Sequence, residues 1–105
     1  MYQLRIYTLP TTDALEHYAA VHRPRHIPSL RGFGVTTHGI WTEHDVDAHR
    51  LIAMISYPDG ANPADVNAAY MASPEFVADM DGFDVSDIID VEELSLDRAA
   101  ASPLS

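Results

Sequence analysis

Cysteine and lysine are both missing from this sequence of 105 residues. Without cysteine the chain can form no disulfide, use no thiolate nucleophile and offer no sulfur ligand to a metal. Without lysine its positive charge comes from arginine alone, and 16 acidic residues against six basic ones give a net charge of −10. The field of such a chain repels phosphate backbones, so we expect no nucleic acid among its partners.

Long hydrophobic runs are missing as well. No stretch approaches the roughly 20 apolar residues that a membrane-spanning helix needs, and the first residues alternate like a strand and do not resemble a signal peptide. A cytoplasmic protein that does not enter a membrane is the expectation. The hydrophobic fraction of 47% is ordinary for a globular protein, and the length suits one domain with one core.

Four segments are predicted as β-strands. Residues 2–8 alternate apolar and polar side chains, residues 34–43 begin at a glycine, and residues 87–94 form the last such segment. Residues 50–57 are almost continuously apolar, which indicates a strand buried on both faces. The polar run from Glu43 to His49 predicts a loop before that strand.

A helix is predicted after the first strand, where Thr11 or Thr12 can cap its N-terminus. Its buried stripe recurs at helical spacing and consists of Leu15, Tyr18, Ala19 and His22. Pro24 lacks an amide proton and its ring clashes with the carbonyl four residues earlier, so the helix is expected to kink or end there. Pro28 reinforces the break.

A second helical region is predicted to begin at Asn62 and Pro63, as the N-cap and first helical residue. Its apolar stripe consists of Val66, Ala69 and Tyr70. The sequence Ser73-Pro74-Glu75 then restarts a short helix, which Gly82 ends.

The predicted order of elements is therefore β-α-β-β-α-β, which in so short a chain is typical of the α+β ferredoxin-like fold. Residues 1–96 would form an antiparallel four-stranded sheet with the helices on one face, and residues 97–105 a flexible C-terminal tail. The first strand would be central, with the third and fourth beside it. Because the strands look too apolar to leave the second face in water, we expect two sheets to pair in a homodimer, as a dimeric α/β barrel.

Several short motifs resemble the NIPSNAP family within the dimeric α/β-barrel superfamily. The opening Y-Q-L-R-I-Y-T-L is similar to that family's first strand. His26-x-Pro28, followed by Gly34, Gly39 and Trp41, is similar to the family's H-x-x-P…G…G-x-W pattern. The segment from Tyr57 to S-P-E-F also resembles a family segment. The resemblance implies a barrel-forming dimer with a small-molecule cavity between sheet and helices in each subunit, and it fixes no activity.

The chain departs from the family pattern in two places. An arginine commonly found near the start of the second helical region is here Pro63 or a neighbour, and Pro24 lies in what is usually helix. If that arginine serves a family ligand, the ligand differs in this protein.

His22, His26 and His38 are the candidate catalytic residues. His22 and His26 are four residues apart, a spacing that can ligate zinc on an unbroken helix. Pro24 bends that geometry and no third ligand can be identified, so no metal site is predicted, and two histidines that satisfy the helix end are the simpler interpretation. For general acid–base chemistry near neutral pH, His26 at the helix exit and His38 in the second strand both qualify by position.

Strand alternation places His38 with Thr36 and Ile40 on one face, and Trp41 with Gly39 on the other. Only one of His38 and Trp41 can then line a cavity on the helix side. The simpler interpretation of His38 is a hydrogen-bonded histidine in the barrel interior or at an interface. Gly39 leaves a space beside the Trp41 indole, which a planar ligand or a neighbouring side chain could fill.

Arg5 shares a strand face with Gln3 and Tyr7, and a buried guanidinium requires a partner. Asp90 or Glu92 on the last strand could supply that partner in a structural ion pair. Alternatively Arg5, with Tyr7 beside it, binds a carboxylate or phenolate ligand.

Tyr18 and Tyr70 lie on the apolar stripes of the two helical regions, where each hydroxyl could orient a ligand or simply pack. Arg23, Arg25 and Arg31 form a basic cluster that could receive an anionic substrate. Docking on the acidic segment 79–93 of another subunit, or exposure to solvent, is favoured for this cluster. The aspartates of that segment do not follow the spacing of a calcium loop and are interpreted as a solvated acidic face.

These residues lead to a hypothesis of cofactor-free acid–base catalysis. An apolar, aromatic or polyketide-like molecule would undergo cyclisation, isomerisation or elimination, with His26 as the first candidate for the acid or base. Trp41, Tyr18 and Tyr70 would shape the pocket. A cofactor-free monooxygenase acting on a phenol and a non-catalytic binding or assembly protein are the alternatives.

Overall fold

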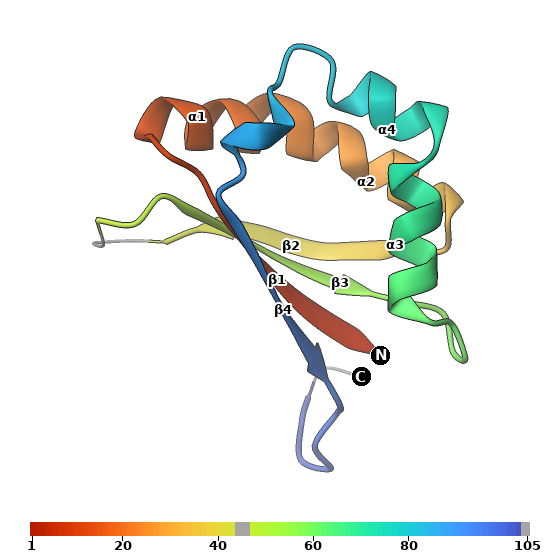
Figure 1. The fold of residues 1–105 in the computed structure, drawn as a ribbon. Helices are drawn as coiled ribbons and strands as arrows, with labels where there is room; N and C mark the ends of the chain where they lie inside the picture. Colours follow the sequence, from red (N-terminus) through yellow and green to blue (C-terminus); the bar gives the residue numbers. More distant parts are fainter. Residues whose placement is uncertain (44–46, 104–105) are drawn as a thin grey trace.

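The computed structural model describes residues 1–43 and 47–103 as four strands that alternate with helical segments (Figure 1). The strands are β1 (Tyr2–Thr8), β2 (Thr36–Thr42), β3 (Arg50–Ser56) and β4 (Asp90–Leu96). The helices are α1 (Thr12–His17), the π-helical turn η1 (Tyr18–His22), α2 (Arg23–Gly32), α3 (Pro63–Met71), α4 (Pro74–Asp79) and the 3-10 turn η2 (Val85–Asp87). Residues 44–46 of the predicted loop and residues 104–105 of the predicted tail lie outside the described residues.

The strands form one antiparallel sheet in the order β2-β3-β1-β4. β1 is central, as predicted, between β3 and β4. The helices lie over one face of this sheet (Figure 1). The prediction of an α+β ferredoxin-like fold is confirmed.

Each helix that follows a loop begins at a capped N-terminus. The side chains of Thr11, Asn62 and Ser73 each accept a hydrogen bond from a main-chain N–H of the first turn, at 3.0, 2.9 and 3.2 Å. Pro63 and Pro74 follow two of these caps, at a position where a missing N–H removes no helical hydrogen bond. The predicted helix starts are therefore confirmed.

The first helical region was predicted to kink or end near Pro24, with Pro28 reinforcing the break, and it ends at neither proline. Tyr18–His22 form a π-helical turn in which the N–H of Arg23 bonds to the carbonyl of Tyr18, and α2 then runs through Pro28 to Gly32. The wider turn lies immediately before Pro24, where a regular helix would lose one hydrogen bond to the missing N–H. The proline therefore coincides with a local change of helical pitch and not with a helix end.

The helix-covered face of the sheet carries the buried side chains of β3. Leu51, Ala53 and Ile55 are at most 1% exposed, whereas Ile52 and Met54 on the other face are only partly buried. The prediction that this strand is buried on both faces is wrong for the single chain, because helices cover one face only. The homodimer that would cover the other face stays a prediction.

Two groups of buried residues fill the space between sheet and helices. One consists of Tyr7, Leu9, Tyr18, Leu51, Ala53 and Met80, and the other of Leu30, Val35, Ile55, Tyr57 and Tyr70.

No helix in residues 1–43 and 47–103 has the length and apolar character required to cross a membrane.

Candidate functional site

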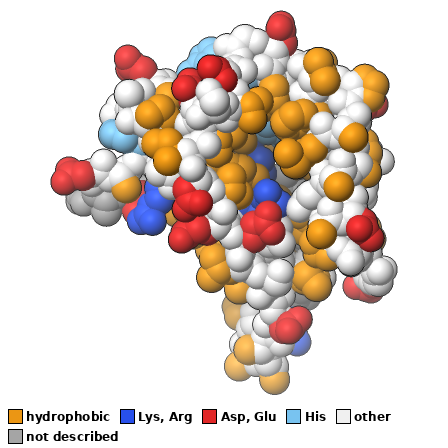
Figure 2. All heavy atoms as spheres, in the orientation of Figure 1, with side chains coloured by type: hydrophobic (Ala, Val, Ile, Leu, Met, Phe, Trp, Pro, Cys, Tyr) orange, Lys and Arg blue, Asp and Glu red, His pale blue; other side chains and the backbone are white. Residues whose placement is uncertain are grey.

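A cavity of about 270 Å³ lies between the helix-covered face of the sheet and the helices. Figure 2 shows the opening as a hollow in which hydrophobic side chains surround arginine atoms. The lining residues are Arg5, Tyr7, Tyr18, Arg23, His26, Leu30, Ile55, Asn67, Tyr70, Met71, Phe76, Met80, Val85, Ile88 and Val91. The wall is thus mainly apolar and aromatic, with a few polar groups, as is usual for small-molecule sites.

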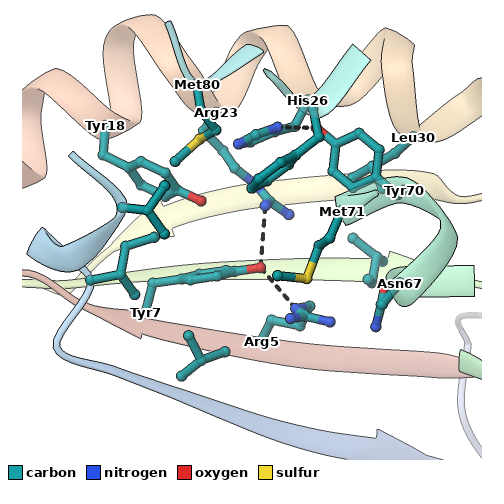
Figure 3. Close-up of a pocket in the computed structure, with 15 residues that line it drawn as sticks. Arg5, Tyr7, Tyr18, Arg23, His26, Leu30, Asn67, Tyr70, Met71 and Met80 are labelled. Carbon is teal, nitrogen blue, oxygen red and sulfur yellow. Dashed lines mark hydrogen bonds between the residues drawn. The ribbon is translucent and has the colours of Figure 1, made fainter. Parts of the chain in front are cut away.

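Helix α2 contributes three side chains to this wall. Arg23, His26 and Leu30 are its buried residues, at the i, i+3, i+7 spacing of one helix face. The π-helical turn sets this face, since it brings Arg23 close to the same side of the helix as Tyr18, five residues earlier. Figure 3 shows the Arg23 side chain running from α2 toward Tyr7 on β1.

His26, Tyr70 and Asp79 form a hydrogen-bonded group at the cavity wall. The Tyr70 hydroxyl donates to Oδ2 of Asp79 at 2.6 Å. The same hydroxyl contacts Nδ1 of His26 in a short hydrogen bond (Figure 3). Nδ1 also lies 3.5 Å from the Asp79 carboxylate. Since the hydroxyl proton points to Asp79, Nδ1 is assigned as the protonated ring nitrogen.

The environment keeps His26 neutral. Burial, together with the positive charge of Arg23, lowers the pKa of His26 to about 4, and the Asp79 carboxylate offsets only part of this shift. Burial and the hydrogen bond to Asp79 raise the pKa of Tyr70 far above its ordinary value. At neutral pH the group therefore consists of an uncharged imidazole and a protonated phenol. Nε2 of His26 has no hydrogen-bond partner among the described residues.

Tyr7 lies between two arginines at the floor of the cavity. Its hydroxyl oxygen accepts from Nε of Arg5 at 2.8 Å and from Nη1 of Arg23 at 3.3 Å. Arg5 also donates to Gln3 at 3.3 Å and pairs with Glu93 at 3.1 Å. The predicted structural ion pair of Arg5 therefore exists, but its partner is neither of the two acidic residues that were predicted.

The partner differs because of the strand register. Arg5 lies directly opposite Glu93 in the β1–β4 pairing, so the two side chains share one sheet face. Glu92 lies opposite Ile6 and points to the other face, and Asp90 lies opposite Thr8 at the end of the strand.

The NIPSNAP sequence profile matches residues 2–103. The chain belongs to the NIPSNAP family. Its fold resembles a NIPSNAP family protein of unknown function from Agrobacterium tumefaciens, with 20% identity, a TM-score of 0.77, and coverage of 99% of this chain and 92% of that chain. An uncharacterised NIPSNAP domain protein from Burkholderia xenovorans gives 18% identity, a TM-score of 0.76 and 97% coverage of both chains.

SnoaB, a cofactor-independent oxygenase from Streptomyces nogalater, is a more distant structural relative of this NIPSNAP chain. It gives 14% identity, a TM-score of 0.52 and 96% coverage of both chains. At such identities the likeness concerns the fold alone. No curated protein is significantly similar to this sequence.

Five of the predicted site residues of the NIPSNAP protein line the cavity: Arg5, Tyr7, Tyr18, His26 and Tyr70. His22 does not. It is fully buried, with Nδ1 hydrogen-bonded to the Asp79 carbonyl at 2.9 Å and Nε2 at 2.9 Å from Nε2 of His17. These bonds tie η1 to the end of α4, which is a structural role.

His38 and Trp41 were expected on opposite faces, and this prediction was wrong. The pairing of β2 with β3 shifts between Thr37 and Gly39, so a β-bulge at His38 resets the alternation. Trp41 lies opposite Ile52 on the outer face and is 51% exposed. His38 is exposed too, with Nε2 2.7 Å from the Ser56 hydroxyl, so neither residue lines the cavity.

The space predicted beside Gly39 exists, and the Trp41 indole fills it. A Cβ at position 39 would overlap this ring. No room remains there for a planar ligand, and Trp41 is not a wall of the cavity.

Two residues of the site, Arg23 in the cavity wall and Asp79 behind it, were not predicted from the sequence. Arg23 was assigned to docking or solvent, yet it is 3% exposed. Of the three clustered arginines, Arg25 has hydrogen bonds to segment 79–93, through the carbonyls of Asp79 and Asp81 in its own chain. Asp79 was counted in a solvated acidic face, yet it is 7% exposed. Its spacing from Phe76, three residues earlier on α4, was the available signal, since both lie on one helix face.

Proposed function

We propose that this NIPSNAP protein binds an apolar, aromatic or polyketide-like molecule in the cavity and catalyses its cyclisation, isomerisation or elimination without a cofactor. The observation that carries the proposal is His26, a neutral imidazole whose Nδ1 is held by Tyr70 and Asp79 and whose Nε2 makes no hydrogen bond to any described residue. A general base needs this combination of fixed orientation and free lone pair.

In the proposed reaction, Nε2 of His26 removes a proton from a carbon next to a carbonyl group of the ligand. The electron pair of the C–H bond forms a carbon–carbon double bond, and the π pair of the carbonyl moves to its oxygen, so the ligand becomes an enolate. The resulting imidazolium is stabilised by the Asp79 carboxylate, 3.5 Å from Nδ1, and the Tyr70 hydroxyl keeps the ring oriented. Return of the proton from Nε2 to another carbon of a conjugated enolate gives an isomer. Attack of the enolate carbon on a second carbonyl closes a ring, and the new alkoxide takes the proton from Nε2. In an elimination the enolate expels a β-hydroxyl group, which takes this proton and leaves as water.

Tyr7 is the proposed donor to the enolate oxygen. Its own O–H proton has no acceptor among the described residues, while its oxygen accepts from Arg5 and Arg23. Two cationic donors on one phenol oxygen make its proton a stronger hydrogen-bond donor, which favours a developing negative charge nearby.

The test is hydrogen–deuterium exchange of 2-tetralone in D₂O, followed by NMR. The wild-type protein should accelerate exchange of the acidic C–H protons over buffer. His26→Gln should reduce this acceleration about 100-fold or more, since general bases contribute ~10²–10⁴-fold.

His38→Gln is the matched control, since His38 lies on the outer face, and it should exchange 2-tetralone at the wild-type rate. Equal rates for wild type and His26→Gln would exclude His26 as the base. Binding without any exchange would instead favour the non-catalytic binding protein.

A cofactor-free monooxygenase is the second candidate, favoured by the fold that the chain shares with SnoaB. The same neutral His26 could deprotonate a phenol before it reacts with oxygen. Oxygen consumption by the purified protein with an anthrol substrate would support this candidate, and turnover of the substrate in the absence of oxygen would support the cyclase or isomerase.

A further inference from the structure

We propose that the ligand of the cavity is a small aromatic carboxylate, and that Nε–H and Nη2–H of Arg23 bind its two oxygens. This inference rests on the small-molecule site proposed above, but not on the reaction assigned to His26.

The guanidinium of Arg23 has one unpaired edge. Nη1 donates to Tyr7, whereas Nε and Nη2 are buried and make no hydrogen bond within 3.5 Å among the described residues. Against the effect of burial, the nearby hydroxyls of Tyr7 and Tyr18 raise the pKa of Arg23, but both are neutral and supply no counterion. Nε–H and Nη2–H lie on the same edge of a guanidinium and point in parallel, which is the arrangement that binds both oxygens of one carboxylate. A buried cation with no counterion is strongly disfavoured, so this edge calls for an anion.

The number of unpaired charges favours a carboxylate over a phosphate. Arg5 is the other cation of the cavity, and its three nitrogens are occupied by Tyr7, Gln3 and Glu93. Arg23 is therefore the arginine without an ion pair among the described residues that line the cavity. A single negative charge matches it, whereas a phosphate dianion would carry excess charge into a protein whose net charge is already −10.

The rest of the cavity fits the ring of such a ligand. Its volume of about 270 Å³ is near the lower end of small-molecule sites, which are roughly 300–1,000 Å³, and this favours one or two rings. Tyr18, Tyr70 and Phe76 offer aromatic surface, and the Phe76 ring stacks on His26 at 6.1 Å between centroids. Because Arg23 and His26 lie three residues apart on one face of α2, a carboxylate on Arg23 would place the ring beneath His26 (Figure 3).

Calorimetric titration near neutral pH tests this inference with pairs of probes. Wild-type protein is titrated with benzoate and 2-naphthoate, and with their neutral alcohols, benzyl alcohol and 2-naphthalenemethanol. At least one carboxylate should bind about tenfold or more tightly than its alcohol, since charge-assisted hydrogen bonds are the stronger kind. Failure of both carboxylates to bind, or equal binding within each pair, would overturn the proposal, and this comparison depends on no variant.

Variants then locate the anion. Arg23→Lys keeps the charge but loses the paired donors, and should weaken carboxylate binding about tenfold or more. Arg31→Lys, at an exposed arginine of the same helix, is the matched control and should bind like wild type. If a folded Arg23→Lys protein keeps full affinity for the carboxylate, the assignment to Arg23 is wrong.

Two measurements on the wild-type protein, carboxylate binding and exchange of 2-tetralone, separate this inference from the proposed function. Tight carboxylate binding without any exchange by wild type would leave the anion site in place while the catalytic proposal fails.

Discussion

Asp79 contributes to the site through both its side chain and its main chain. Its carboxylate accepts from Tyr70 and lies near His26, whereas its carbonyl oxygen accepts from Nδ1 of His22 at 2.9 Å and from Nη1 of Arg25 at 3.4 Å. The end of α4 is therefore fixed to η1 and α2 by the same residue that orients the imidazole. His22, which seemed catalytic from its spacing, contributes to the site by fixing this carbonyl.

The pKa of His26 predicts how stability depends on pH. An unfolded histidine titrates near 6.5, but His26 in the folded protein titrates at about 4, so between these values the unfolded state binds more protons. The free energy of unfolding should therefore fall as pH is lowered from about 6.5 to about 4, by up to about 3 kcal/mol from this residue.

Urea denaturation at several pH values measures this effect. His26→Gln has no titrating ring at position 26, so its stability should lose less over the same pH range than that of wild type. Parallel curves for the two proteins would mean that His26 titrates normally in the folded state.

Residue types alone could identify some of these side chains. His26 and Tyr70 were found because a histidine at a helix exit and a tyrosine on an apolar stripe face the same interior in a fold with helices on one side of a sheet. Arg23 could not be placed, because its position depends on a π-helical turn that has no recognised signal in this sequence. Trp41 and His38 were misplaced because one bulge inverts the alternation for every later residue of the strand.

At the scale of elements, the N-cap of α4 determines where Asp79 lies. Ser73 Oγ donates to the Tyr70 carbonyl at 2.5 Å and accepts from the N–H of Phe76 at 3.2 Å, so one hydroxyl joins the end of α3 to the start of α4. Both members of the Tyr70–Asp79 hydrogen bond are thereby held by the same turn. The sequence Ser-Pro-Glu predicted this helix start, and the consequence for the site became visible only in three dimensions.

Ser73→Ala should lower the free energy of unfolding by about 1 kcal/mol, the usual effect of losing a cap, and should also slow 2-tetralone exchange because Asp79 is less firmly placed. Thr11→Ala removes the corresponding cap of α1 and is the matched control. Its stability should fall by a similar amount while exchange stays at the wild-type rate. Equal exchange rates in the two variants would show that the α4 cap is not coupled to the site.

At the scale of the whole molecule, the outer face of the sheet is apolar and uncovered. Trp41 and Leu94 are 51% and 45% exposed there, and Leu4, Ile6 and Ile52 lie beside them on the neighbouring strands. The helices leave this face open, and among residues 1–43 and 47–103 the segment after β4 reaches only one end of it, where residues 97–99 and Ser102 share a pocket with Tyr2, Met54 and Leu96. We propose that a second copy covers the rest, which accords with the homodimer expected from the composition of the strands.

Light scattering during size-exclusion chromatography should therefore give twice the mass of one chain. Leu94→Asp should shift the protein to the mass of one chain, because a charge would be buried in the interface. Val77→Asp is the control, since Val77 is 71% exposed on α4, away from the outer face, and should leave the dimer intact. A wild-type protein that elutes with the mass of one chain would contradict the homodimer.

The π-helical turn before Pro24 suggests how the position of Arg23 in the cavity can change between related proteins. Relative to a regular helix, a turn of this kind corresponds to one additional residue, and removing that residue would rotate everything after it by about 100° around the helix axis. Arg23 would then leave the cavity together with His26 and Leu30, which share its face of α2, while the sheet stayed unchanged. Insertion or deletion of a single codon in this segment is thus a short evolutionary route between a cavity that holds Arg23 and one whose only lining arginine among the described residues is Arg5.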